Sequence, residues 1–251
     1  MIEKMYHTPR ELPRKPPDGV YVIVDVWNFS MTLTTLLDNG AKFVQVAGNP
    51  TAARELKDEY PDAVVGSEPG PDGEIPEGFD FCNSPFDARQ VDVEGRPVGM
   101  YTDNGATTVS RLQESETKLY AGSTLNARAL GKHLRDNEDG VRIISAGYHG
   151  QRAVEDTIGA CLIHRYIHTD EIADVEDTVF HDALRNCEAG RVSMDGSRRT
   201  RNDYTLAHDF NISTLIPRYG EEGFIDATDE ATVDHIAEET RTGGVSDTPS
   251  S

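Results

Sequence analysis

Apolar and polar positions alternate along the chain in blocks, and these blocks predict alternating strands and helices. Residues 20–26 form a nearly continuous apolar run, which is typical of a strand buried on both faces. Shorter apolar runs predict further strands at 42–47, 63–66, 98–102, 118–121, 141–146 and 224–227. Helices are predicted between them, ending near residues 37, 59, 112, 135 and 167, with two more at 178–187 and 204–208. This alternation predicts an α/β fold, a three-layer αβα arrangement around a largely parallel or mixed sheet.

Turn and cap residues set the limits of the predicted elements. Asn28 or Ser30 can cap the first helix, and Asn39–Gly40 ends it. The proline-rich residues 1–19 predict an irregular N-terminal arm, followed by a single domain over 20–227. The polar residues 228–251 predict a mobile tail.

The composition adds a strong negative charge to this picture. The chain has 44 acidic and 24 basic residues, for a formal net charge of -20. Such a charge destabilises a compact chain unless salt screens it, so its spread along the sequence predicts a halophilic, salt-adapted protein. An ordinary acidic protein is the alternative. The charge argues against nucleic acid and acidic membranes as partners, and the basic run 198–201 is predicted to be a solvated loop.

Cysteine spacing and hydropathy indicate a cytoplasmic location. Cys82, Cys161 and Cys187 are far apart, so the sequence predicts neither a disulfide framework nor a zinc site. The opening segment lacks the apolar core of a signal peptide. No apolar run approaches the roughly 20 residues that span a bilayer.

Small polar residues and carboxylates follow almost every predicted strand. Ligands of α/β sheets bind at the carboxyl ends of the strands, and helix N-termini there favour anions. Carboxylates at this edge are the oxygen ligands that Mg²⁺ prefers. Capping of helices and closure of turns is the alternative role for these side chains. Adjacent helical residues face different ways, so Glu155 and Asp156 cannot both point inward, and Asp156 is favoured.

Five segments, in order, resemble the 2-phosphosulfolactate phosphatase (ComB) family. Residues 24–30 stand where that family carries a DVLRA(S/T)T-like segment, and residues 78–85 resemble its GFDxGNSP. Residues 102–105 resemble its TTNGT, and residues 123–127 resemble its SxxNA. The pair 146–147, followed by Glu155–Asp156 and Gly159–Ala160, resembles its AG…ED…AG helix.

This resemblance implies Mg²⁺-dependent hydrolysis of a phosphate monoester on a small sulfonated or carboxylated acid. In that family the activity serves coenzyme M biosynthesis. Residue type and position assign catalytic roles to Asp25, Asp156 and Asn104, and metal binding to Asp25, Glu68 and Glu155. Substrate binding is assigned to Asn28, Ser30, Asn83, Ser84, Gly105, Ser123, Asn126 and Gly147. The expected partner is a small phosphorylated anion, with a homodimer left open.

The chain departs from the family pattern at positions that bind anions. Asn28 and Pro69 stand where the family carries arginine, and Asp103 replaces a threonine. Asparagine cannot reproduce the two-pronged hydrogen bonding of arginine to phosphate. The expected replacements are Arg89, Arg111, Arg128 or Arg152. The alternative function is a sibling with altered or lost catalysis that binds a small anion or a partner protein.

Overall fold

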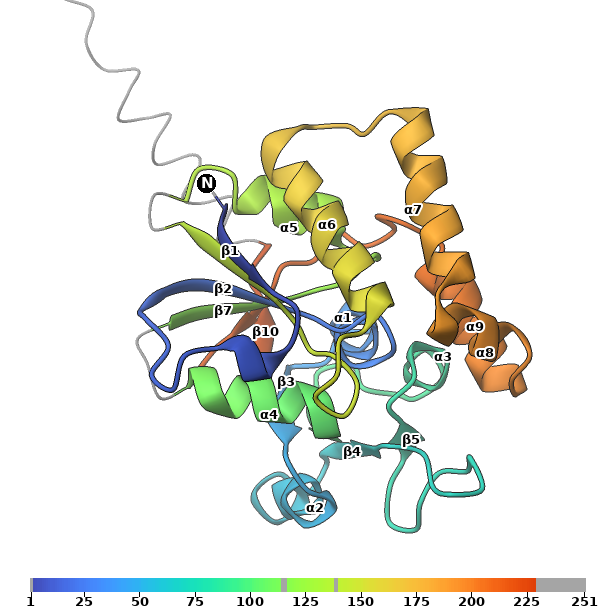
Figure 1. The fold of residues 1–251 in the computed structure, drawn as a ribbon. Helices are drawn as coiled ribbons and strands as arrows, with labels where there is room; N and C mark the ends of the chain where they lie inside the picture. Colours follow the sequence, from blue (N-terminus) through green and yellow to red (C-terminus); the bar gives the residue numbers. More distant parts are fainter. Residues whose placement is uncertain (1, 114–116, 138–139, 229–251) are drawn as a thin grey trace, which may run out of the picture.

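A computed structural model describes residues 2–113, 117–137 and 140–228, so the predicted tail lies outside them from residue 229 onward. Within these residues one mixed sheet is flanked by helices on both faces, which confirms the three-layer αβα arrangement (Figure 1). The strands are β1 (Ile2–Tyr6), β2 (Gly19–Val24), β3 (Phe43–Ala47), β4 (Val64–Ser67), β5 (Phe81–Cys82), β6 (Pro97–Tyr101), β7 (Thr117–Gly122), β8 (Val141–Ser145), β9 (Pro217–Tyr219) and β10 (Phe224–Asp226). The helices are η1 (Pro9–Glu11), α1 (Phe29–Asp38), α2 (Pro50–Glu59), α3 (Pro85–Ala88), α4 (Asp103–Leu112), α5 (Ala127–His133), α6 (Val154–His168), α7 (Asp174–Asn186), α8 (Glu188–Met194) and α9 (Arg198–Ala207).

The sheet consists of two parallel halves joined by an antiparallel pair of strands. Its order is β1-β8-β2-β7-β9-β10-β3-β6-β4-β5. Strands β1, β8, β2 and β7 pair in parallel, and so do β3, β6, β4 and β5. Strands β9 and β10 pair antiparallel with each other and with β7 and β3 on either side. The two halves therefore run in opposite directions along the sheet.

Sheet twist brings the carboxyl ends of the two halves to the same region. The order β2-β7-β9-β10-β3-β6-β4 places six steps between β2 and β4. Each step rotates neighbouring strands by about 20–25°, which amounts to about 120–150° over the six. The side-chain amide of Asn28, beyond β2, accordingly donates to the carbonyl oxygen of Asn83, beyond β5, at 3.1 Å.

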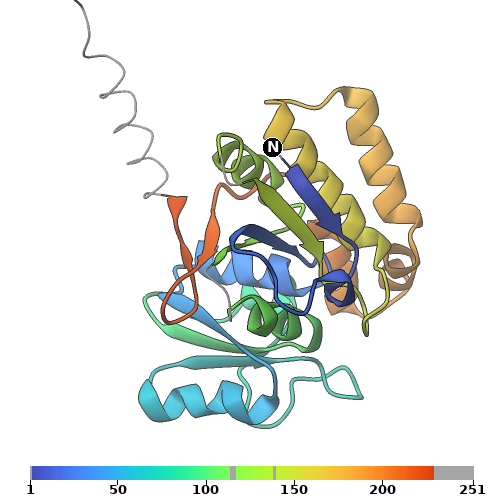
Figure 2. The same ribbon diagram turned by 60° about the vertical axis from the view of Figure 1, so that its left-hand side comes forward.

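Alternate residues of β2 fill the two faces of the core. Val22 and Val24 pack with residues of α5 and α6, whereas Tyr21 and Ile23 pack with residues of α1 and α4. Figure 2 shows α2 at the end of the molecule away from α6, where it covers the β3 half of the sheet. Both faces of β2 are therefore buried, as its continuous apolar run predicts.

Two local predictions are wrong. Residues 2–6 of the predicted irregular arm form β1, which pairs in parallel with β8 at the edge of the sheet. The basic run 198–201 is the first turn of α9 and not a solvated loop, because Ser197 caps the helix by accepting from the Thr200 N–H. No helix in the described ranges combines the length and apolar character needed to cross a membrane.

Candidate functional site

Two buried carboxylates lie together where β2 and β8 end. Asp25 follows β2 and Asp156 lies in the first turn of α6, and their exposed fractions are 4% and 2%. Asp156 accepts from the N–H of Val26 at 2.9 Å and from the N–H of Gly147 at 2.8 Å. Asp25 accepts from the N–H of Phe29 at 3.3 Å, so it also caps α1. Asp156 therefore ties α6 to the segments that follow both strands.

The four carboxylates singled out in the sequence lie close enough to affect one another. Burial raises the pKa of Asp25 well above its ordinary value, and the charges of Asp156, Glu68 and Glu155 raise it further. Burial, with the nearby charge of Glu155, raises the pKa of Asp156 to about 8. Burial also raises the pKa values of Glu68 and of the half-buried Glu155. A buried carboxylate with a raised pKa is stabilised either by binding a proton or by binding a cation.

Two asparagine side chains beside these carboxylates have oxygens without hydrogen bonds among the described residues. The Asn83 amide N–H donates to Glu68 Oε1 at 3.1 Å, and the Asn28 amide N–H donates to the Asn83 backbone carbonyl. These bonds fix which end of each amide is nitrogen. Asn28 Oδ1 and Asn83 Oδ1 are buried, and neither has a partner in the described part of the chain. Such atoms are uncommon in folded proteins, so these two oxygens are available to accept from water or to bind a ligand.

This donor set suits Mg²⁺ without forming an all-protein cage. Within the described residues, no three His, Cys, Asp or Glu side chains form a group that could hold a metal ion. Mg²⁺ is usually bound by one or two carboxylates, with water and substrate phosphate as its other ligands. Asp25, Glu68 and the two free amide oxygens supply such donors. The assignment of Asp25, Glu68 and Glu155 as a metal set stays a prediction.

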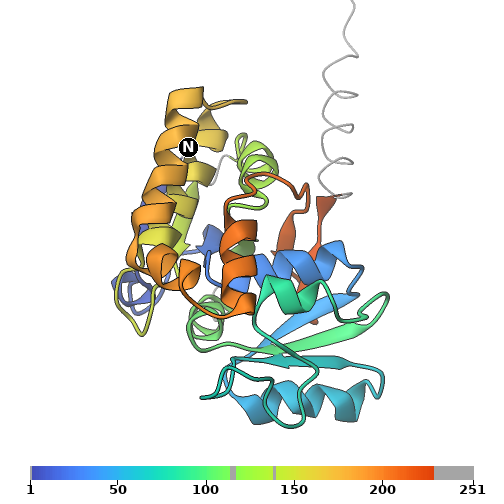
Figure 3. The same cartoon turned by 90° about the vertical axis from the view of Figure 1, so that its right-hand side faces the viewer.

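Helix α9 holds the loop that carries Asn83 and Ser84, a role that the sequence did not reveal. The Ser84 hydroxyl donates to both carboxylate oxygens of Asp203, each at 2.8 Å, and the Phe86 N–H donates to one of them at 2.9 Å. Arg199 forms an ion pair with Asp87 at 2.9 Å. Figure 3 shows α9 beside α3. No local pattern marks Asp203, because its partners lie more than 100 positions away in the chain.

Four predicted substrate-binding residues have structural contacts of their own. The Ser30 hydroxyl accepts from the Asp25 N–H at 3.1 Å, and Asn126 Oδ1 accepts from the Ser123 N–H at 2.9 Å. A side chain at Gly105 would lie 2.7 Å from the ring of Phe29, so glycine allows α4 to pack closely there. Substrate binding by these residues stays a prediction, and the contacts show that each shapes the backbone around the site.

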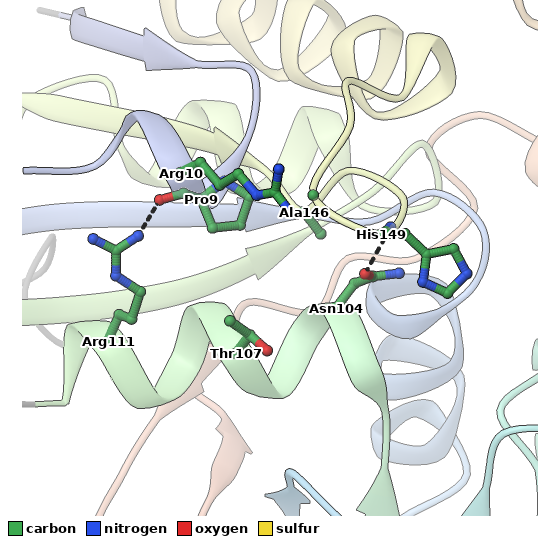
Figure 4. Close-up of a pocket in the computed structure, with 8 residues that line it drawn as sticks. Pro9, Arg10, Asn104, Thr107, Arg111, Ala146 and His149 are labelled. Carbon is green, nitrogen blue, oxygen red and sulfur yellow. Dashed lines mark hydrogen bonds between the residues drawn. The ribbon is translucent and has the colours of Figure 1, made fainter.

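The loop between β8 and α6 joins the carboxylates to a pocket of about 270 Å³. Gly147 donates to Asp156 at one end, and His149 donates through its backbone N–H to Asn104 Oδ1 at 3.2 Å (Figure 4). Arg111 also lines the pocket, and its guanidinium donates to the Leu12 carbonyl at 3.2 Å.

The other three arginines expected to replace the two family arginines, at positions 28 and 69, do not line this pocket. Arg152 pairs with Glu11 at 2.8 Å, and the Arg128 guanidinium lies over the Tyr166 ring at 5.4 Å. Arg89 is exposed at the end of α3. Arg111 alone among these four lines the described pocket.

Comparison with known proteins gives one consistent family. The model of the family described as 2-phosphosulpholactate phosphatase matches residues 6–192. A protein of Gloeobacter violaceus, named as a probable 2-phosphosulfolactate phosphatase, is 34% identical over 163 residues, which are 64% of this chain and 67% of that protein. Proteins with the same name from Deinococcus radiodurans and Prochlorococcus marinus are 28% and 29% identical, over 82% and 88% of this chain and 90% and 97% of their own. Because the family model spans most of the sequence, this chain belongs to the 2-phosphosulfolactate phosphatase family.

Proposed function

We propose that this protein is a Mg²⁺-dependent phosphatase acting on the phosphate monoester of a small sulfonated or carboxylated acid. The observation that carries the proposal is the proximity of Asp25 and Glu68, together with the buried side-chain oxygens of Asn28 and Asn83, which have no partner in the described part of the chain. The names of the relatives, probable 2-phosphosulfolactate phosphatases, agree with this chemistry.

The carboxylates of Asp25 and Glu68 would hold the cation, together with the free oxygens of Asn28 and Asn83. Bound there, Mg²⁺ would neutralise charge on the phosphoryl oxygens and help position the attacking water. Without a cation, burial and the negative charges of its neighbours raise the pKa of Asp25 and so favour its protonated form. Binding of a cation by Asp25 and Glu68 would therefore favour release of protons from these carboxyl groups.

The neighbouring residues position the cluster and exclude solvent. Asp156 holds the N–H groups of Val26 and Gly147, which keeps the ends of β2 and β8 in register beside Asp25. The side-chain N–H of Asn83 holds Glu68 at 3.1 Å. Trp27 stacks in parallel on Tyr204 of α9, with ring centroids 6.2 Å apart. The Trp27 indole N–H is buried without a partner among the described residues, so it is available as a donor to an anion.

Phosphate release at high salt tests the proposal directly. The substrates are 2-phosphosulfolactate, phospholactate and p-nitrophenyl phosphate, each assayed with Mg²⁺ and with EDTA. We expect Mg²⁺-dependent release that Asp25→Asn and Glu68→Gln each reduce by about 100-fold or more, since each removes a charge that faces the reacting group. Asp58→Asn, on the exposed face of α2, is the matched control and should leave the rate unchanged.

The outcomes separate the phosphatase from a non-catalytic relative. Folded protein that releases phosphate from none of the three substrates refutes the phosphatase. If such protein still binds sulfolactate in calorimetry, the function is that of an anion-binding sibling. The anion-binding sibling is the second candidate function because Asn28 and Pro69 stand where the family carries arginine.

A further inference from the structure

The pocket beside the carboxylate cluster is positively charged in a strongly negative protein. It lies between η1, α4 and the β8–α6 loop, and its described lining includes Arg10 and Arg111 but no Asp or Glu. Among the described residues Arg111 pairs with no carboxylate, because the groups that accept from it are the backbone carbonyls of Pro9, Leu12 and Pro13. With a net charge of -20 for the chain, two arginines without a carboxylate form a local site for an anion.

Arg10 is the second cation in this pocket. No hydrogen bond or ion pair joins its guanidinium to another residue in the described ranges. Its guanidinium is nevertheless placed, because it packs on Gly150, where an added Cβ would lie 2.4 Å from Nε. The neighbouring carboxylate of Glu11 is already engaged by Arg152 at 2.8 Å and by the His7 N–H at 3.0 Å. Figure 4 shows Arg10 extending towards Ala146.

A single short loop connects this arginine to the carboxylate cluster. Gly147 contacts Asp156 through its N–H, and three residues later Gly150 contacts Arg10. Three Cα steps span at most about 11 Å, so the backbone that contacts Asp156 and the backbone that contacts Arg10 lie within that distance of each other. His149, between the two glycines, donates its backbone N–H to Asn104 and has a φ of 47°. The loop therefore sets the distance between the cluster and Arg10.

We propose that Arg10 binds the acid group of the substrate, a carboxylate or sulfonate, while the phosphoryl group lies at the Asp25–Glu68 cluster. This inference rests on the proposed function and adds the residue that selects for a second negative charge. A planar guanidinium with free N–H groups forms paired hydrogen bonds with either acid group. The basic residue of the acid subsite thus comes from the N-terminal segment, which precedes the five resembling motifs and lies within residues 6–192 matched by the family model.

Substrate selectivity of Arg10→Gln tests the inference. We expect the KM for phospholactate and 2-phosphosulfolactate to rise about tenfold or more, as for the loss of one charge-assisted hydrogen bond. The KM for p-nitrophenyl phosphate, which has no second acid group, should stay within about twofold. Arg14→Gln is the matched control, because Arg14 is an exposed arginine in the same segment and lies outside the pocket. Arg10→Lys keeps the charge and should restore part of the affinity.

Calorimetry with sulfolactate supplies a readout that does not need turnover. Wild-type protein and Arg14→Gln should bind it alike, whereas Arg10→Gln should bind it about tenfold or more weakly. Equal binding by all three proteins overturns the inference, even if the phosphatase is active. An equal rise in KM for p-nitrophenyl phosphate also overturns it, because Arg10 would then serve the phosphate. Arg10-dependent binding by protein without activity supports the inference and refutes the proposed phosphatase.

Discussion

Replacement of Asp203 by asparagine should make the protein's stability less dependent on pH. Asp203 is 1% exposed and accepts from the Ser84 hydroxyl and the Phe86 N–H. Burial raises its pKa from 3.8 to about 6, although the two hydrogen bonds oppose the shift. The folded state therefore holds this proton more tightly than the unfolded state. The stability that the protonated Asp203 carboxyl contributes is fully present below about pH 3.8 and is lost as the pH rises through about 6.

The size of the effect follows from the shift. At 1.36 kcal/mol per pKa unit, moving the pKa from 3.8 to about 6 corresponds to about 3 kcal/mol when the group is fully ionised. About 2 kcal/mol of this is lost between pH 4.5 and pH 7.5. Asparagine stays neutral, and its oxygen can still accept from the Phe86 N–H while its amide donates to the Ser84 hydroxyl. Between pH 4.5 and pH 7.5, the free energy of unfolding of Asp203→Asn should therefore rise by about 2 kcal/mol relative to that of wild type.

Urea unfolding followed by the fluorescence of Trp27, the single tryptophan of the chain, measures this difference. Trp27 stacks on Tyr204, the neighbour of Asp203, so it reports on the same part of the molecule. Unfolding at pH 4.5, 6 and 7.5 in constant salt gives the free energies for wild type and variant. The exposed Asp195→Asn is the control and should follow wild type at every pH. A difference between Asp203→Asn and wild type that is constant or reversed with pH would refute the reasoning.

Three further predictions concern packing, an ion pair and salt. Gly105→Ala should lower the free energy of unfolding by about 1–3 kcal/mol in urea denaturation, because its Cβ would press on the Phe29 ring; an unchanged value contradicts the close packing. Arg199→Gln should cost about 1–3 kcal/mol in the same assay, since Asp87, 11% exposed, loses its cation; a cost no larger than that of the exposed Arg201→Gln contradicts this. Raising KCl from about 0.1 to 2 M should raise the urea midpoint, because screening of the net charge of -20 relieves self-repulsion; a constant or falling midpoint contradicts a salt-adapted surface.

Local pattern was sufficient to predict most of the helices and strands. The apolar run 20–26 corresponds to β2 at Gly19–Val24. The helix predicted to end near residue 59 corresponds to α2 at Pro50–Glu59, which Asn49 caps by accepting from the Ala52 N–H at 2.9 Å. Strand β9 and helix α8 were missed because both are short. So few residues show no recognisable spacing of hydrophobic positions, and the position of β9 is fixed by its pairing with β7 and β10.

The sequence predicted which residue types gather at the candidate site, and the roles assigned to them stay predictions. Asp25, Glu68 and Asp156 were expected to converge because carboxylates follow strands, and they affect one another electrostatically in the structure. Ser123 and Asn126 follow a strand in the same way, yet they hydrogen-bond to each other and to backbone. Position after a strand does not distinguish these cases, because it does not fix where the side-chain atoms find partners.

The sequence by itself determined the α/β class, the order of most elements, the acidic surface and the resemblance to the family. These properties depend on local periodicity, composition and short motifs, so neighbouring residues suffice to specify them. Only the tertiary structure decided that β9 and β10 join two opposed halves of the sheet, that Asp203 holds Ser84, and that Arg10 reaches the β8–α6 loop. Each of these depends on residues far apart in the chain, and their contacts arise from sheet twist and close packing, which no local pattern encodes.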